Sequence, residues 1–262
     1  MAKNTLLIAE GDSWFALPDV FLYPFDIINQ LRSFGYDVES VAVRGRLLHD
    51  MVKHTGAIKK KIKKNKRPKA ILLSGGGNDV LGCLPQMLNK GGYGKPIIKM
   101  HKAKAVVKRI EKQYEQWLRS VTKTCKKHHK AEIPILIHGY GYVVPNNQPT
   151  FYPWVWLYKH FRNKNQMNLQ ANTNALVDLM DLFNQMLFNL PKKRNLNHVK
   201  YIDLRDCLSN SLVCRDNPEE NYTEANPCNA EFQMDWNDEV HPTSDGFLKI
   251  AKKFRREIER LP

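Results

Sequence analysis

The chain has 262 residues, of which 42% are hydrophobic, and its 41 lysines and arginines give it a net charge of +15. This length and composition can bury a full hydrophobic core, so we expect one domain over residues 1–262. Charged residues interrupt every apolar run, which excludes a transmembrane segment, and the first residues lack a Sec signal pattern. We therefore expect a cytoplasmic protein, or one exported by a route without a Sec signal peptide.

Short apolar runs alternate with segments of helical periodicity along the chain. Strands are predicted at residues 5–9, 37–43, 70–74, 133–138 and 199–204. Helices are predicted at residues 24–34, 47–64, 102–127, 169–190 and 244–260. Because strands and helices alternate in this way, the pattern predicts an α/β fold with a parallel sheet.

Glycine-rich segments follow the first four predicted strands. Their sequences are "GDSW", "VRGRL", "SGGGND" and "HGYGYVVP". Each of them, taken alone, is explained by a tight turn. Ligands bind beyond the carboxyl ends of the strands in a parallel sheet, so these segments are the first place to look for a functional site.

Ser13 in "GDSW" is a candidate nucleophile, and a serine hydroxyl needs a histidine base oriented by a carboxylate. His241 in "DEVHPTSDGF" has Asp238 three residues upstream, which lets the carboxylate reach Nδ1 while Nε2 faces the serine. Asp235 is a less favoured orienter. Alone, Ser13 is a turn serine and His241 a loop histidine, and only their combination indicates a serine hydrolase.

The developing oxyanion of an acyl transfer needs hydrogen-bond donors. The side-chain amide of Asn78 follows the third strand, and the backbone N–H of Gly45 follows the second. With the N–H of Ser13 they make three candidate donors. A glycine suits position 45 because a side chain there would crowd a substrate approaching the amide.

These four segments resemble the motif blocks of the SGNH hydrolases, also called GDSL-like esterases and lipases. The blocks read "AEGDSWF" with Ser13, "VAVRGRLL" with Gly45, "GGGND" with Asn78 and "DEVH" with Asp238 and His241. The resemblance covers most of the chain and implies a flavodoxin-like three-layer α/β/α sandwich with a central, mainly parallel five-stranded sheet. It also implies a serine esterase that cleaves carboxylic esters through an acyl-enzyme.

Two departures from the family pattern leave the substrate open. Trp14 replaces the usual leucine after the serine, and Val43 and Arg44 stand where an asparagine commonly precedes the glycine. The chain has no G-x-S-x-G, H-E-x-x-H or P-loop motif, and its other histidines lack metal-ligand spacing. We therefore expect a metal-independent enzyme without a cofactor, and no obligate protein partner.

Two long loops leave the predicted catalytic edge, at residues 82–100 and 140–167. The first is glycine-rich and can act as a lid. The second contains "PTFYPWVWLYKHF", whose aromatic residues either pack a small cap or line a wall for the substrate. With Trp14, we take Trp154 and Trp156 as candidate substrate-binding residues. A lysophospholipid or an acetylated glycan is the expected natural ester.

The basic charge is concentrated in "KKKIKKNKRPK", from Lys59 to Lys69, and in lysines between residues 95 and 130. Such runs are usually the hydrated faces of helices. The alternative is a polyanion-binding protein that uses this surface to contact nucleic acid or an anionic membrane.

The five cysteines form no C-x-x-C pair, which argues against a zinc ribbon or a thioredoxin-like site. Reduced or buried thiols are the simpler interpretation. A disulfide between two of Cys207, Cys214 and Cys228 is the alternative if the protein works in an oxidising compartment.

Overall fold

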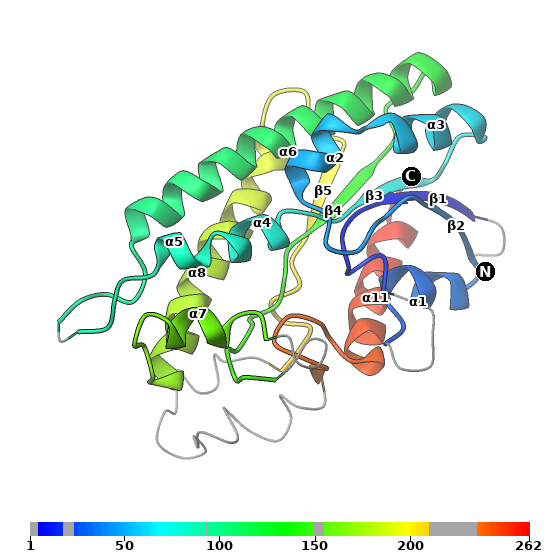
Figure 1. Cartoon of the computed structure of the whole chain (residues 1–262). Helices are drawn as coiled ribbons and strands as arrows, with labels where there is room; N and C mark the ends of the chain where they lie inside the picture. Colours follow the sequence, from blue (N-terminus) through cyan, green and yellow to red (C-terminus); the bar gives the residue numbers. More distant parts are fainter. Residues whose placement is uncertain (1–4, 18–23, 93, 149–154, 210–234) are drawn as a thin grey trace.

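The computed structural model describes residues 5–17, 24–92, 94–148, 155–209 and 235–262. Five strands form one parallel sheet in the order β2-β1-β3-β4-β5 (Figure 1). They are β1 (Thr5–Glu10), β2 (Tyr36–Ser40), β3 (Ala70–Leu73), β4 (Ile135–His138) and β5 (Val199–Ile202). All four pairings are parallel, so the predicted α/β sandwich is confirmed, with a fully parallel rather than a mainly parallel sheet.

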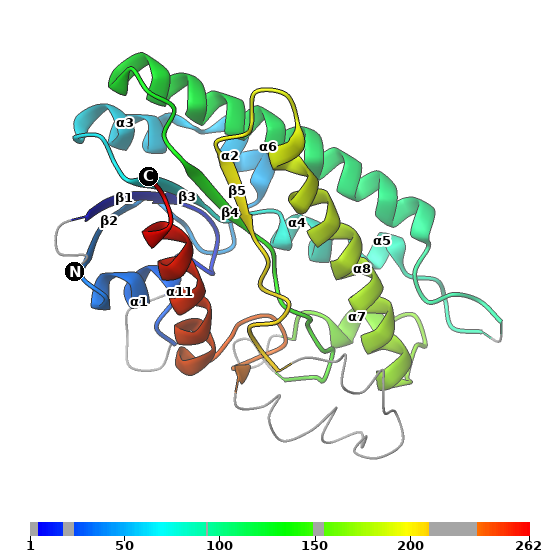
Figure 2. The ribbon, with the colours of Figure 1, turned by 180° about the vertical axis from the view of Figure 1, so that it is seen from behind.

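Helices cover both faces of the sheet, as Figures 1 and 2 show from opposite sides. One face carries α1 (Ile27–Ser33) and α11 (Ser244–Glu259), which pack against each other. The other carries α2 (Leu48–Lys53), α3 (Gly56–Lys64), α6 (Met100–His129) and α8 (Leu169–Asn189). Because both faces are covered, the strands are apolar runs rather than alternating ones, and β3 and β4 are buried along their whole length.

The 30-residue helix α6 is the longest element and spans about 45 Å. Its predicted apolar stripe is buried, and the indole of Trp117 reaches the end of β1. The lysines between these positions face outward. The stripe therefore fixes α6 across the sheet, while its polar side remains in contact with solvent.

Two predicted segments differ from the expectation. The helix predicted at 47–64 is broken into α2 and α3 at His54 and Thr55, where the backbone leaves helical geometry. The predicted loop at 82–100 begins with α5 (Leu84–Met87) and closes through an antiparallel bridge between Leu88 and Ile98. Leu88 and Ile98 are both buried, so the base of this loop is anchored in the core.

Three further short helices were not predicted: α4 (Gly77–Gly82), α7 (Tyr158–Arg162) and the 3₁₀ helix η1 (Leu190–Lys192). The first of them begins at the carboxyl end of β3, beside the expected site. Within the described residues, no helix combines the length and the apolar composition that crossing a bilayer requires.

Candidate active site

Ser13 lies in a tight turn directly beyond β1. The Phe15 and Ala16 amides donate back to the carbonyls of Asp12 and Ser13. A side chain at Gly11 would lie 2.7 Å from the Cβ of Ser74, so only glycine allows β1 and β3 to approach this closely. The turn holds Ser13 at the carboxyl edge of the sheet, where it is 5% exposed.

Asp238 and His241 lie in one short loop that leads into α11. The Asp238 carboxylate accepts hydrogen bonds from the backbone N–H groups of Val240 and His241 through Oδ1, and its Oδ2 lies 2.9 Å from His241 Nδ1. Trp236 and Pro242 close the loop with an antiparallel bridge. The three-residue spacing therefore does place the carboxylate on the imidazole.

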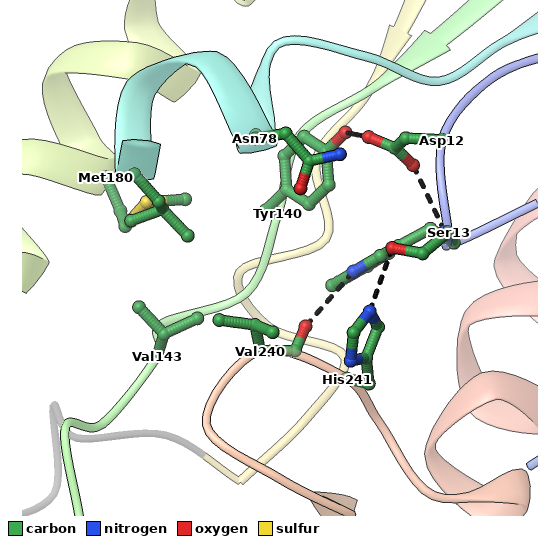
Figure 3. Close-up of a pocket in the computed structure, with 11 residues that line it drawn as sticks. Asp12, Ser13, Asn78, Tyr140, Val143, Met180, Val240 and His241 are labelled. Atoms are coloured by element: carbon green, nitrogen blue, oxygen red, sulfur yellow. Dashed lines mark hydrogen bonds between the residues drawn. The ribbon is translucent and has the colours of Figure 1, made fainter. Parts of the chain in front are cut away.

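The imidazole joins this loop to Ser13. His241 Nε2 lies 2.8 Å from Ser13 Oγ, and Figure 3 shows the hydroxyl and the ring facing each other. A carboxylate only accepts hydrogen bonds, so Asp238 favours the tautomer with the proton on Nδ1 and leaves the Nε2 lone pair for the serine O–H. Ser13, Asp238 and His241 thus form one buried hydrogen-bonded chain.

Asp12 forms a second polar group beside Ser13 that the sequence did not single out. Its Oδ1 accepts from the Ser74 hydroxyl at 2.8 Å, and its Oδ2 accepts from the Tyr140 hydroxyl at 2.6 Å. Burial raises the pKa of Tyr140 well above its ordinary value, and the nearby Asp12 carboxylate adds to this effect. Tyr140 therefore stays protonated and donates to Asp12.

The expected oxyanion donors Asn78 and Gly45 differ in whether they line the pocket with Ser13. Asn78, near the start of α4, lines the pocket with Ser13, and its Nδ2 donates to the Arg46 carbonyl at 3.2 Å. Gly45 lies one residue before Arg46, in an exposed turn with φ +72°, which favours glycine. It does not line the pocket itself, although its turn contacts Asn78 through Arg46.

The pocket above Ser13 and His241 is small and largely apolar. Its volume is about 20 Å³. The apolar part of its wall comes from Trp14, Leu81, Tyr140, Val143, Met180 and Val240, several of which are labelled in Figure 3. The part of the pocket enclosed by these residues is therefore narrow, with space for about one water molecule.

The predicted substrate-binding tryptophans have different positions. Trp14 lines the pocket, and its indole N–H donates to the Val240 carbonyl at 3.2 Å, which ties the serine turn to the histidine loop. Trp156 is half-buried against the core and is not among the pocket residues. Trp154 lies outside the described residues, together with Phe151 and Tyr152. Of the predicted aromatic wall, Phe161 is fully buried and packs in the core.

Glu239, inside the "DEVH" block, anchors the 140–167 loop to the histidine loop. Its buried carboxylate accepts hydrogen bonds from four backbone N–H groups, which belong to Asn147, Trp156, Leu157 and Tyr158, at 2.6 to 3.1 Å. Burial raises the pKa of Glu239 to about 7, while these four donors lower it. No sequence motif indicates this contact, because the donors are backbone groups that any residue supplies.

Asp235, the less favoured orienter, lies away from His241. Its carboxylate accepts from the Ser209 N–H at 2.8 Å and from Lys249 Nζ at 2.6 Å. It therefore joins the start of the histidine loop to α11 instead of orienting the imidazole.

The described cysteines Cys83, Cys125 and Cys207 carry free thiols. Cys214 and Cys228, the other two cysteines of the predicted disulfide, lie outside the described residues. Among the residues that the structure describes, no group of three or more His, Cys, Asp or Glu side chains is placed to hold a metal ion.

Comparisons with known proteins agree with this architecture. Residues 16–254 match the family model of the GDSL-like lipases and acylhydrolases. Among curated proteins, none matches the sequence at a significant level.

Three solved structures share the fold at low sequence identity. A variant of Axe2, an acetyl-xylooligosaccharide esterase from Geobacillus stearothermophilus, has a TM-score of 0.53 and 14% identity, with 98% of this chain and 96% of that chain covered. The acetyl xylan esterase AlAXEase has a TM-score of 0.52 and 15% identity, over 96% and 98% of the two chains. A member of the lipolytic G-D-S-L family from Veillonella parvula has a TM-score of 0.51 and 14% identity, over 98% and 99%.

Proposed function

Because the chain belongs to the GDSL-like lipase and acylhydrolase family, we propose that it hydrolyses carboxylic esters through an acyl-enzyme on Ser13. The observation that carries this proposal is the chain of short contacts from Asp238 through His241 to the Ser13 hydroxyl, 2.9 Å and 2.8 Å long. This is the arrangement that a serine nucleophile requires, with a base in contact and a carboxylate that orients the base.

In the proposed reaction, Ser13 Oγ attacks the ester carbonyl carbon and its proton passes to His241 Nε2. The oxyanion is held by the Ser13 N–H and by Asn78 Nδ2, which keeps one hydrogen free while the other bonds the Arg46 carbonyl. The N–H of Gly45, in the neighbouring turn outside the pocket lining, is the third expected donor. The intermediate collapses by breaking the C–O bond, and His241 protonates the departing alcohol. Water, deprotonated by His241, then releases the acid from Ser13.

The size of the pocket favours a short acyl group. The enclosed part, about 20 Å³, suits a methyl group better than a long chain, and Val143 and Met180 line the pocket across from Ser13. Of the two expected natural substrates, this favours an acetylated glycan over a lysophospholipid. The acetyl esterases with the same fold are consistent with this choice, although their similarity concerns the fold alone.

The test is p-nitrophenyl acetate hydrolysis by the wild type, by Ser13→Ala and by Ser33→Ala, an exposed serine in α1 that serves as the matched control. Ser13→Ala should abolish both the activity and covalent labelling by a fluorophosphonate, and Ser33→Ala should change neither. Equal rates for wild type and Ser13→Ala would rule the proposal out.

Chain-length dependence tests the acyl group. The wild type should prefer acetate over butyrate and hexanoate esters. Val143→Ala should raise kcat/KM for butyrate by about tenfold and leave acetate almost unchanged, because each buried methylene contributes about 0.8 kcal/mol. A wild type that prefers hexanoate would contradict the acetyl assignment but not the serine mechanism.

A second function, polyanion binding, is favoured by how α3 packs against α6. The His129 ring contacts the Ile62 carbonyl at 3.0 Å, which places the basic ends of the two helices side by side. The exposed cations there include Lys60, Lys63, Lys64, Lys123, Lys126, Lys127 and Lys130. Desolvation lowers the pKa of the exposed His128, and the surrounding cations, Lys63 first, lower it further.

This surface extends the Lys59–Lys69 segment at the sheet edge opposite Ser13, so it could bind an anion without blocking the pocket. Binding of a labelled DNA duplex should fall steeply with salt because phosphate contacts release counterions. Replacing Lys60, Lys63 and Lys64 by glutamine should flatten that salt dependence. Absence of binding to both DNA and anionic vesicles at low salt would exclude this function.

A further inference from the structure

Glu10 is a buried carboxylate that the proposed reaction does not use. It is the last residue of β1, three residues before Ser13, and its exposure is 0%. A charged side chain in a strand that is otherwise apolar is costly to bury unless it has partners. Two donors point at it, one to each oxygen.

The first donor is Trp117 of α6, whose indole N–H lies 2.9 Å from Glu10 Oε2. The second is Arg46, whose Nη1 lies 3.2 Å from Oε1. Arg46 is 15% exposed and Glu10 is not exposed at all, so water screens their attraction only weakly. Both contacts favour the ionised carboxylate, while burial raises the pKa of Glu10 to about 7.

Arg46 connects this carboxylate to the expected oxyanion donors. Its backbone carbonyl accepts the Asn78 Nδ2 hydrogen bond at 3.2 Å, and its N–H closes the turn by donating to Val43 at 3.2 Å. Gly45 lies inside that turn. Within the described part of the chain its N–H has no hydrogen-bond partner, so it remains available for a substrate.

We propose that Glu10 is a positioning residue for the oxyanion hole: through Arg46 it fixes both the Gly45 turn and the Asn78 side chain. The inference rests on the proposed function. Glu10 does not touch the substrate, and its effect reaches the reacting atoms through one ion pair and one backbone carbonyl.

The shape of the Arg46 guanidinium matters in addition to its charge. Arg46 bonds Glu10 through Nη1, and its Nη2 contacts the His54 carbonyl at 3.4 Å. Two contact points set both the position and the orientation of the side chain, and therefore of the turn that carries it. A lysine keeps the charge but donates from a single atom.

The primary test is Glu10→Gln with p-nitrophenyl acetate. It keeps the side-chain shape but presents an NH₂ group to one of the two donors. We expect kcat to fall between about tenfold and hundredfold with KM within about twofold, since a misplaced donor weakens transition-state binding more than substrate binding. Arg46→Met should produce the same split, and Arg46→Lys should recover part of kcat.

Coupling to Asn78 separates this role from a general loss of structure. Asn78→Ala alone should lower kcat by about a hundred- to a thousandfold. If Glu10 acts through Asn78, the double variant should lose less than the product of the two single losses. The matched control is Glu39→Gln, which breaks the ion pair with Lys61 at the neighbouring strand β2 and should leave kcat unchanged.

If the wild type is active and Glu10→Gln has an unchanged kcat, the inference is overturned. It is also overturned if the losses of the two single variants multiply in the double variant. Either result leaves the serine mechanism intact. If Glu10→Gln fails to fold, the same criteria apply to Arg46→Met, which keeps the carbonyl that Asn78 bonds. A Ser13→Ala variant as active as the wild type would instead overturn the proposed function.

Discussion

Two buried glutamates lie close in sequence to the proposed catalytic residues, one before Ser13 and one before His241, and the protein holds them in different ways. Glu10, at the end of β1, is held by two side chains, the Arg46 guanidinium and the Trp117 indole. Glu239, in the histidine loop, is held by four backbone N–H groups of the 140–167 loop. Glu10 connects the segment before Ser13 to the turn that carries Arg46, on the side of the expected oxyanion donors. Glu239 connects the histidine loop to the 140–167 loop, on the side of the proposed base.

The difference concerns what each contact depends on. The Glu10 contacts depend on the identity of two side chains, so single substitutions can weaken them. The Glu239 contacts depend on the path of the backbone, and three of the donors are the successive amides of residues 156, 157 and 158 at the start of α7. Successive amides form a concave site for an anion, and every substitution except proline keeps these N–H groups.

The largest expected effect is on stability, from deleting each carboxylate. Glu239→Ala leaves four N–H groups without an acceptor and should lower the free energy of unfolding by about 4 kcal/mol. Glu10→Ala leaves two donors, one of which can reach water, and should cost about 2 kcal/mol. Urea denaturation measures both.

Glu39→Ala is the control, since it removes a partly exposed ion pair and should cost less than about 1 kcal/mol. Equal losses for Glu10→Ala and Glu239→Ala would show that the number of donors does not distinguish the two sites.

The next effect concerns the pH dependence of stability. Burial raises the pKa of Glu10 from 4.5 to about 7, so the folded protein binds more protons than the unfolded chain between these values. The resulting stabilisation is complete below pH 4.5 and is lost as the pH rises through about 7. It amounts to about 3 kcal/mol.

The Glu10→Gln variant has no titrating group at this position. Its free energy of unfolding should therefore not show this part of the decline with rising pH. Unfolding free energies measured at intervals from pH 5 to pH 8 test the expectation. If Glu10→Gln has the same pH dependence as the wild type, Arg46 and Trp117 offset the effect of burial on the Glu10 pKa completely. The same series on Glu239→Gln would show whether the four amides offset the burial of Glu239 better.

The smallest effect on stability is expected from changing the side chain of a residue whose N–H binds the Glu239 carboxylate. Asn147 contributes its N–H at 3.1 Å, and its φ of 65° is one that glycine adopts freely. Asn147→Gly should therefore change the free energy of unfolding by less than about 0.5 kcal/mol. A loss above about 2 kcal/mol would show that the side chain, and not only the backbone, holds this loop.

Much of the fold could be predicted from the sequence because buried parallel strands are continuous apolar runs. All five strands lie at the predicted places, although β2 ends at Ser40, three residues before the predicted limit. Beyond that point the Val41 N–H still bonds the Ala9 carbonyl of β1, the Val43 N–H bonds Gly11 just after β1, and the chain then turns at Gly45. Apolar residues continue past the end of the strand, so composition alone could not locate it.

The geometry of the candidate site was predictable where the proposed chemistry needs particular side chains at fixed spacing, as with the contact between Asp238 and His241. The contacts of Glu10 and Glu239 were harder to predict. Glu10 carried a signal, a charged residue at the end of an apolar run, but its partner Trp117 lies 107 residues away. Glu239 carried none, since its donors are amides 81 to 92 residues distant that have no sequence signature.

The contact between Ser13 and His241 joins residues that are 228 positions apart. A ribosome that adds about 5–20 residues per second therefore needs roughly 11–46 s after making Ser13 before the histidine exists. Throughout that interval the nascent chain carries a serine without the base that would activate it. Chemical reactivity at the proposed nucleophile is thus acquired late in synthesis, after all five strands have been made.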